Sequence, residues 1–266
     1  MLYTKFDHEF IFKKQALDYL ALNAEPDKVF IYTVNLTLCK LDIGLLWGCL
    51  SPKEKIQANK YYTSNLRNRY IISHSILRCI LGYYTYQLPQ DVEFFYNDYG
   101  KPFLQNNNIQ FNMSHSHDLV SYIISPYYKA GIDIEWHDMT LDIDELTSLV
   151  LTSYEHKLIA ELKDIKKLEF FYNLWTIKES LIKASGHGLS YPINTIEIAA
   201  SLPNHKIPLD SKIHKPTQEW YNYFPLEIAK DYSGAIAIEH KIKQVIYLEM
   251  DSQNHTFGQT GSKYID

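Results

Sequence analysis

Hydrophobic and polar positions follow two periodicities along this chain, and each predicts a different kind of element. Short runs rich in β-branched and aromatic residues, some with alternating polar positions, predict strands. These runs cover residues 29–38, 92–96, 109–113, 119–125, 129–135, 193–200, 219–229, 233–240 and 242–249. Apolar residues that recur every three or four positions predict helices. They cover residues 51–62, 65–84, 142–150, 153–162 and 165–185.

The order of these elements indicates an α+β fold in two parts, each mixing helices with a small, mostly antiparallel sheet. Ser51 followed by proline is typical of a helix start, and Gly186 ends the last long helix. We expect an N-terminal half over residues 1–127, a C-terminal half over residues 128–250 and a frayed polar tail over residues 251–266. No internal repeat is visible in the sequence.

Composition and charge exclude several classes of protein. With 266 residues, 46% of them hydrophobic, the chain can bury a core without disulfide or metal staples. A net charge of −5 argues against a general nucleic-acid-binding protein, which needs a basic face. The three cysteines form no C-x-x-C pair, which indicates buried thiols in a reducing compartment. No secretory leader and no long apolar run is present, so we expect a cytoplasmic protein without membrane contact.

Two carboxylates share one face of the strand predicted at 129–135. Alternate side chains of a strand project to the same side, so Asp133 and Glu135 lie together while Ile132 and Ile134 face the other way. Two adjacent carboxylates repel unless a cation lies between them, and Mg²⁺ is the simplest candidate. Taken alone, a D-x-E pattern of this kind favours an ordinary exposed strand face with two solvated acids.

The last long helix presents an aromatic ring, an acid and a base in a row. Trp175, Glu179 and Lys183 are spaced by four residues and lie along one helix face. Taken alone, this spacing favours an exposed Glu–Lys pair of no functional importance. A third acid facing the Asp133–Glu135 pair would favour a site instead.

A third string, residues 111–116, ends a strand in two serines around a histidine. His115, between Ser114 and Ser116, can bind a phosphate, and a histidine held in a turn by its neighbours is the alternative. A Ser-His-Asp triad is a weak hypothesis, because the chain has no G-x-S-x-G motif.

Together these strings resemble the 4′-phosphopantetheinyl transferases, in particular the long, two-half Sfp-type branch. Four blocks carry the resemblance in the family's order. They are Tyr99-Gly100-Lys101-Pro102, Phe111-Asn112-Met113-Ser114-His115-Ser116, Gly131-Ile132-Asp133-Ile134-Glu135, and Trp175 to Lys183 continuing to Pro192. The resemblance implies two similar α+β halves related by a pseudo-twofold, with the active site at their junction.

The resemblance also implies a reaction and a set of roles. The phosphopantetheine arm of coenzyme A would be transferred to a serine of an apo acyl, peptidyl or polyketide carrier protein, with release of 3′,5′-ADP. Asp133, Glu135 and Glu179 would hold Mg²⁺, or Mn²⁺. Glu179, or a water on the metal, would accept the serine proton, and Lys183 would neutralise the pyrophosphate.

A basic pocket for the coenzyme A 3′-phosphate is implied as well. Its predicted contacts are Lys101, Ser114 and His115, with Arg69 reaching the nucleotide. Lys178 and Lys183 would add positive charge, so a chain of net negative charge could still bind a polyanion. A monomer acting in secondary metabolism is expected by analogy.

Some features depart from the family's pattern. Glu54 and Gln57 stand where basic residues are usual, which puts coenzyme A affinity in doubt, and Arg78 is expected in a structural ion pair. Trp136 and His137 also replace a frequent basic residue.

A catalytically impaired module that binds coenzyme A or a carrier protein is the alternative function, and a different metal-dependent phosphotransfer enzyme is a third. The first forty residues form either a strand on the first half or a partner contact.

Overall fold

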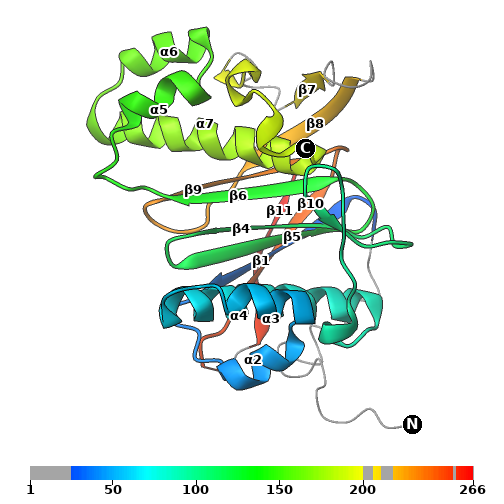
Figure 1. Cartoon of the computed structure of the whole chain (residues 1–266). Helices are drawn as coiled ribbons and strands as arrows, with labels where there is room; N and C mark the ends of the chain where they lie inside the picture. Colours follow the sequence, from blue (N-terminus) through cyan, green and yellow to red (C-terminus); the bar gives the residue numbers. More distant parts are fainter. Residues whose placement is uncertain (1–24, 200–205, 211–217, 254–255, 266) are drawn as a thin grey trace, which may run out of the picture.

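The computed structural model describes residues 25–199, 206–210, 218–253 and 256–265. Most of the stretch for which the sequence left open a strand or a partner contact lies outside these residues. Figure 1 shows four layers, in which two sheets lie between an upper and a lower group of helices. No helix in the described part of the chain is both long and apolar enough to cross a membrane.

The lower half consists of a five-stranded sheet covered by helix α4. The strand order is β11-β10-β1-β5-β4, and every neighbouring pair is antiparallel except β1 with β10. Its strands are β1 (Lys28–Asn35), β4 (Gln110–Ser116), β5 (Leu119–Ser125), β10 (Gln244–Met250) and β11 (Phe257–Tyr264). Its helices are α2 (Ile43–Cys49), α3 (Pro52–Ala58), α4 (Ser64–Thr85) and the short 3₁₀ turn η2 (Pro89–Asp91). The hairpin of β2 (Phe95–Tyr96) and β3 (Pro102–Phe103) follows.

The upper half consists of a four-stranded antiparallel sheet covered by helix α7. The strand order is β6-β9-β8-β7. Its strands are β6 (Ala130–Trp136), β7 (Lys206–Asp210), β8 (Gln218–Pro225) and β9 (Tyr232–Ile238). Its helices are α5 (Ile143–Val150), α6 (Ser153–Ala160), α7 (Asp164–Ser185) and the 3₁₀ turns η3 (Gly188–Ser190) and η4 (Ile193–Thr195). Each half has its own apolar core. A further apolar cluster packs between the two sheets and joins the halves, and it includes Ile31, Ile123, Ile132 and Ile236.

A buried charge pair occurs at the same place in each half. In α3, Ser51 and Glu54 form a capping box, and the Glu54 carboxylate pairs with Arg78 of α4. In α6, Thr152 and Glu155 form a capping box, and the Glu155 carboxylate pairs with Lys178 of α7. Both cations lie at the fifteenth position of a helix of 22 residues.

The strand connections repeat along with these helices. The set β1-β5-β4 matches the set β6-β9-β8, because each begins before its helices and the two later strands pair in the same antiparallel order. The prediction of two similar α+β halves is therefore confirmed. The repeat is absent from the sequence because different residue types, Arg78 and Lys178 among them, fill equivalent places.

The C-terminal end differs from the sequence-based prediction. Residues 257–264 form β11 and are not a frayed tail, and β10 returns to the first sheet beside β1. Strand β10, expected in the C-terminal half, and strand β11, expected in the tail, therefore both belong to the first sheet, which contains both ends of the described chain. The strand predicted at 193–200 is also wrong, since the short turn η4 occupies residues 193–195.

Candidate active site

Four predicted site residues meet where β6 packs on α7. Asp133 and Glu135 lie on β6, whereas Glu179 and Lys183 lie on α7. Lys183 Nζ is 2.6 Å from Asp133 Oδ1, and Glu179 is close enough for the charge of Asp133 to raise its pKa. Because β6 is the edge strand that contacts β4 of the other sheet, these residues lie at the junction of the halves.

Gly131 makes this close packing of strand and helix possible. A Cβ at this position would lie 2.1 Å from the carbonyl oxygen of Ser180 and 2.4 Å from the backbone nitrogen of Ala184. Any side chain here would therefore collide with the backbone of α7. The glycine in the sequence block around the two acids thus sets the distance between β6 and α7.

Each of the three carboxyl groups has a raised pKa. Burial raises the pKa of Asp133, which is 2% exposed. Burial and then the charge of Asp133 raise the pKa of Glu135 to about 7, and the same two causes raise the pKa of Glu179. The charge of Lys183 acts in the opposite direction on all three. One ammonium group therefore does not offset the cost of gathering three carboxylates in a partly buried place.

The donor atoms have the chemistry of a site for a hard divalent cation. Asp133 Oδ2 is buried and has no hydrogen-bond partner in the described structure. Carboxylate oxygens are the ligands that Mg²⁺ and Mn²⁺ prefer, and a cation would relieve the repulsion between the acids. Over the described ranges, no three His, Cys, Asp or Glu side chains already have the geometry of a metal site. The ligand types thus suit a divalent cation, although the side chains do not already have the geometry that coordinates one.

Ser114, predicted to hold a phosphate, uses its hydroxyl inside the protein. Ser114 Oγ donates to Asp133 Oδ1 at 2.9 Å, and it accepts from Lys183 Nζ at 3.0 Å and from the N–H of Ile134 at 3.3 Å. A hydroxyl has one proton and two lone pairs, so this set of partners is full. The geometry favours a role in fixing Asp133, and direct phosphate binding by this hydroxyl stays a prediction.

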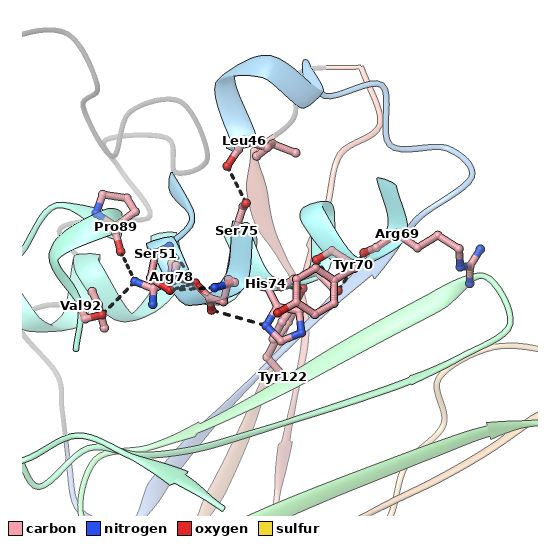
Figure 2. Close-up of polar contacts among 12 residues, drawn as sticks. Leu46, Ser51, Arg69, Tyr70, His74, Ser75, Arg78, Pro89, Val92 and Tyr122 are labelled. Carbon is pink, nitrogen blue, oxygen red and sulfur yellow. Dashed lines mark hydrogen bonds and ion pairs between the residues drawn. The ribbon is translucent and has the colours of Figure 1, made fainter. Parts of the chain in front are cut away.

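His115 and Arg69 lie in a group of basic side chains that also includes His74 and Lys183. The pKa of His115 is lowered by partial burial of its ring and then by the charges of Lys183, His74 and Arg69. Figure 2 shows Arg69 and His74 on α4, and Arg69 Nη1 is 3.4 Å from Asp118 Oδ1. A bound anion would relieve the repulsion among these groups. The sequence reading missed His74, because a single histidine inside a helix carries no recognisable signal.

Lys101 contacts the end of α7 and no other predicted phosphate-binding residue. Its Nζ donates to the carbonyl oxygens of Ala130 at 3.2 Å and Ala184 at 2.9 Å, and burial lowers its pKa to about 8. Asn97 donates from the same turn to the carbonyl oxygen of Gly186 at 2.8 Å. The turn therefore caps the helix that bears Glu179 and Lys183. Phosphate binding by Lys101 remains a prediction.

Glu54 belongs to the framework of the first half, where its carboxylate lies beside Arg78 and His74. Arg78, which pairs with Glu54, also donates to the carbonyl oxygens of Pro89 and Val92, as Figure 2 shows. The prediction that Arg78 forms a structural ion pair is confirmed. Glu54 therefore occupies a place in the core, while Gln57 is exposed on α3.

Lys178 does not supply charge to the site, contrary to the sequence-based expectation. It is fully buried, and its Nζ donates to Glu155 and to the carbonyl oxygen of Val150. Residues 178 and 183 are five positions apart, so their side chains leave the helix on different faces. Lys178 of α7 therefore belongs to the core of the second half, whereas Lys183 lies beside Asp133 in the candidate site.

Trp136 and His137 have structural contacts next to the acids. Trp136 stacks on His117, with 4.5 Å between the ring centroids. His137 is buried against Tyr172, and its Nε2 lies 2.8 Å from Ser233 Oγ. These contacts account for two residues that departed from the family's pattern without explanation.

Ser116, to which the sequence analysis gave no role, bonds one of the acids. Its Oγ donates to Glu135 Oε2 at 2.7 Å, as Ser114 donates to Asp133. A signal was present in the sequence, because Ser114 and Ser116 are two residues apart on β4, as Asp133 and Glu135 are on β6. Only the knowledge that β4 and β6 are neighbours gives this pattern a meaning.

Comparison with known proteins agrees with this geometry. The model of the 4′-phosphopantetheinyl transferase superfamily matches residues 129–237, which include β6 and α7. The 4′-phosphopantetheinyl transferase HetI of Nostoc sp. is 33% identical over 177 residues, which cover 65% of this chain and 74% of that protein. This chain belongs to the 4′-phosphopantetheinyl transferase family.

Other members of the family show similar levels of identity. The 4′-phosphopantetheinyl transferase ffp of Bacillus subtilis is 27% identical over 201 residues, covering 71% of this chain and 87% of that protein. The transferase Sfp of Bacillus subtilis is 31% identical over 153 residues, covering 56% of this chain and 66% of that protein. The family predicted from the four sequence blocks is confirmed, and with it the prediction that this phosphopantetheinyl transferase is an enzyme.

Proposed function

We propose that this transferase moves the phosphopantetheine arm of coenzyme A to a serine hydroxyl of an apo carrier protein and releases 3′,5′-ADP. The observation that carries the proposal is the meeting of Asp133, Glu135, Glu179 and Lys183 at the junction of the halves. Cleavage of a pyrophosphate needs mainly positioning and neutralisation of charge, and three acids with one base beside them can provide both.

The acids would have two tasks. Asp133, Glu135 and Glu179 would hold Mg²⁺ or Mn²⁺, which when bound offsets the negative charge of the coenzyme A pyrophosphate. Glu179 would in addition accept the proton of the carrier serine as its oxygen attacks. Its raised pKa supports this role, because a carboxylate of higher pKa is a better base near neutral pH.

Lys183 would stabilise the leaving phosphate. Its Nζ lies directly beside Asp133, and its side chain is 27% exposed, so it can reach a ligand above the site. An ammonium at this place favours the transition state, in which charge accumulates on the leaving oxygens. The basic group of His115, Arg69 and His74 would hold the 3′-phosphate.

The narrower features belong to the proposal as well. We infer a monomer in the cytoplasm that acts on carriers of secondary metabolism, without a nucleic-acid or membrane partner. Both halves of the site lie on one chain, which supports activity as a monomer. Sedimentation of the purified protein tests this part separately from the chemistry.

The deciding experiment is an incubation of the protein with coenzyme A, Mg²⁺ and a panel of apo carrier proteins, followed by intact-mass measurement. We expect one phosphopantetheinyl group on at least one carrier, and none when EDTA removes the metal. A parallel reaction with 3′-dephospho-coenzyme A tests the phosphate pocket, and we expect it to be slower. Equal use of both donors would contradict the 3′-phosphate contacts. Tight coenzyme A binding without transfer to any carrier would favour a catalytically impaired binding module.

A further inference from the structure

The edges of the two sheets are joined by side chains of β4 that bind the backbone of β6. Asn112 Oδ1 accepts the N–H of Ile132 at 3.0 Å, and Ser116 Oγ accepts the N–H of Trp136 at 3.0 Å. Ser114 accepts the N–H of Ile134 between them. The three bonds recur at every second residue of both strands, and in each the N–H of β6 donates to a side-chain oxygen of β4. Backbone donors at the edge of β6 are thus satisfied by side chains.

The two serines of this ladder do more than join the strands. Once a serine oxygen accepts the N–H of β6, its own proton is still available for donation. Ser114 gives this proton to Asp133, and Ser116 gives it to Glu135 Oε2 at 2.7 Å. In each case the serine accepts from one residue of β6 and donates to the carboxylate just before it.

This geometry fixes the direction in which each carboxylate points. One oxygen of Asp133 is held by Ser114 and Lys183, and the other, Oδ2, is buried without a partner. Glu135 has no lysine bonded to it among the contacts of the described residues, so Ser116 is the hydroxyl that restrains it. A flexible glutamate that is already oriented loses less conformational freedom when it binds an ion.

We propose that Ser116 is a positioning residue, which orients Glu135 for the divalent cation by hydrogen bonding across the junction of the halves. The inference rests on the proposed function, because it assigns to Glu135 the role of a metal ligand. It gives the second serine of the Ser-His-Ser string a task distinct from phosphate binding. It also makes the metal site dependent on both halves, since β4 belongs to one sheet and β6 to the other.

The test compares Ser116→Ala with Asn112→Ala in the full-length protein. Both variants lose one side-chain bond to the backbone of β6, but Asn112 has no bond to a carboxylate among the described contacts. The measurement is the dissociation constant of Mn²⁺, from the spin-resonance signal of the free ion, without coenzyme A or carrier. We expect Ser116→Ala to weaken Mn²⁺ binding about tenfold, as is usual when a ligand's orienting partner is lost. Asn112→Ala should change it little.

Two further variants keep the test decisive. Ser116→Thr retains the hydroxyl and should restore Mn²⁺ binding. Ser116→Cys has similar shape but a weak donor, and it should bind Mn²⁺ poorly even if the alanine variant fails to fold. Equal binding by wild type and Ser116→Cys would overturn the inference, as would equal losses in Ser116→Ala and Asn112→Ala. If the wild type itself neither binds Mn²⁺ nor transfers phosphopantetheine, the proposed function fails instead.

Discussion

At the scale of residues, the candidate site brings three carboxyl groups together although burial and mutual repulsion disfavour their charged forms. Burial raises the pKa of Asp133, Glu135 and Glu179, and Lys183 is the cation bonded to this group in the described structure. The ionised acids therefore weaken the folded state in the absence of metal, whereas the lysine strengthens it. Residues that the proposed function assigns to the same reaction thus have opposite effects on stability.

This contrast gives a prediction for two variants in EDTA at about pH 8, above the pKa of about 7 of Glu135. Glu179→Gln should leave the free energy of unfolding unchanged or raise it, because it removes a carboxylate whose pKa is raised by burial and by Asp133. Lys183→Met should lower it by about 1–3 kcal/mol, because Asp133 loses its partner. Urea unfolding measures both values, and both variants should lose transfer activity. A loss of stability in Glu179→Gln equal to that in Lys183→Met would show that Glu179 is structural.

At the scale of elements, the site depends on how closely β6 approaches α7. Gly131→Ala would place a methyl group against two backbone atoms of α7, at 2.1 Å and 2.4 Å, and neither atom can move independently of the helix. We expect a loss of at least about 3 kcal/mol in the free energy of unfolding. Any folded fraction should bind Mn²⁺ weakly, because Glu179 and Lys183 move away from β6.

Gly48→Ala is the matched control for this prediction. A Cβ at position 48 has no atom within 4 Å, and the residue lies inside helix α2. The exchange should be neutral or stabilise by up to about 1 kcal/mol, because alanine has the higher helix propensity. Equal thermal unfolding temperatures of Gly131→Ala and wild type would contradict the close packing of β6 against α7.

The cap on α7 predicts a dependence of stability on pH. The pKa of Lys101 is about 8 in the folded protein, below its value in an unfolded chain, because its amine is buried. Between about pH 8 and pH 10 the unfolded chain binds more protons at this residue, so its contribution to stability rises with pH. Lys101→Met should lack this rise. Urea unfolding across that range measures the difference between wild type and variant, and a constant difference would contradict the lowered pKa.

At the scale of the whole molecule, local patterns predicted the elements better than their assembly. The strands β5 and β6 and the helices α4 and α7 appear where the runs and spacing of their apolar residues predicted them. Pairing of β10 with β1 joins residues more than two hundred positions apart, and no local pattern records it. For the same reason the acids were found from β6 and α7 alone, whereas Ser116 became meaningful only once β4 was known to lie beside β6.

The same long-range pairing makes the C-terminal strand essential to the first half. Phe257 of β11 is 1% exposed, and its ring meets Tyr32 of β1 edge to face, with 5.0 Å between centroids. Phe257→Ala should therefore lower the free energy of unfolding by about 3–5 kcal/mol, the usual cost of emptying a buried aromatic site. Tyr264→Ala, near the other end of the same strand, removes a ring that is 74% exposed and should change it little. Urea unfolding of both variants distinguishes a strand that completes the sheet from a tail that only lies on it, because a tail would tolerate both substitutions equally.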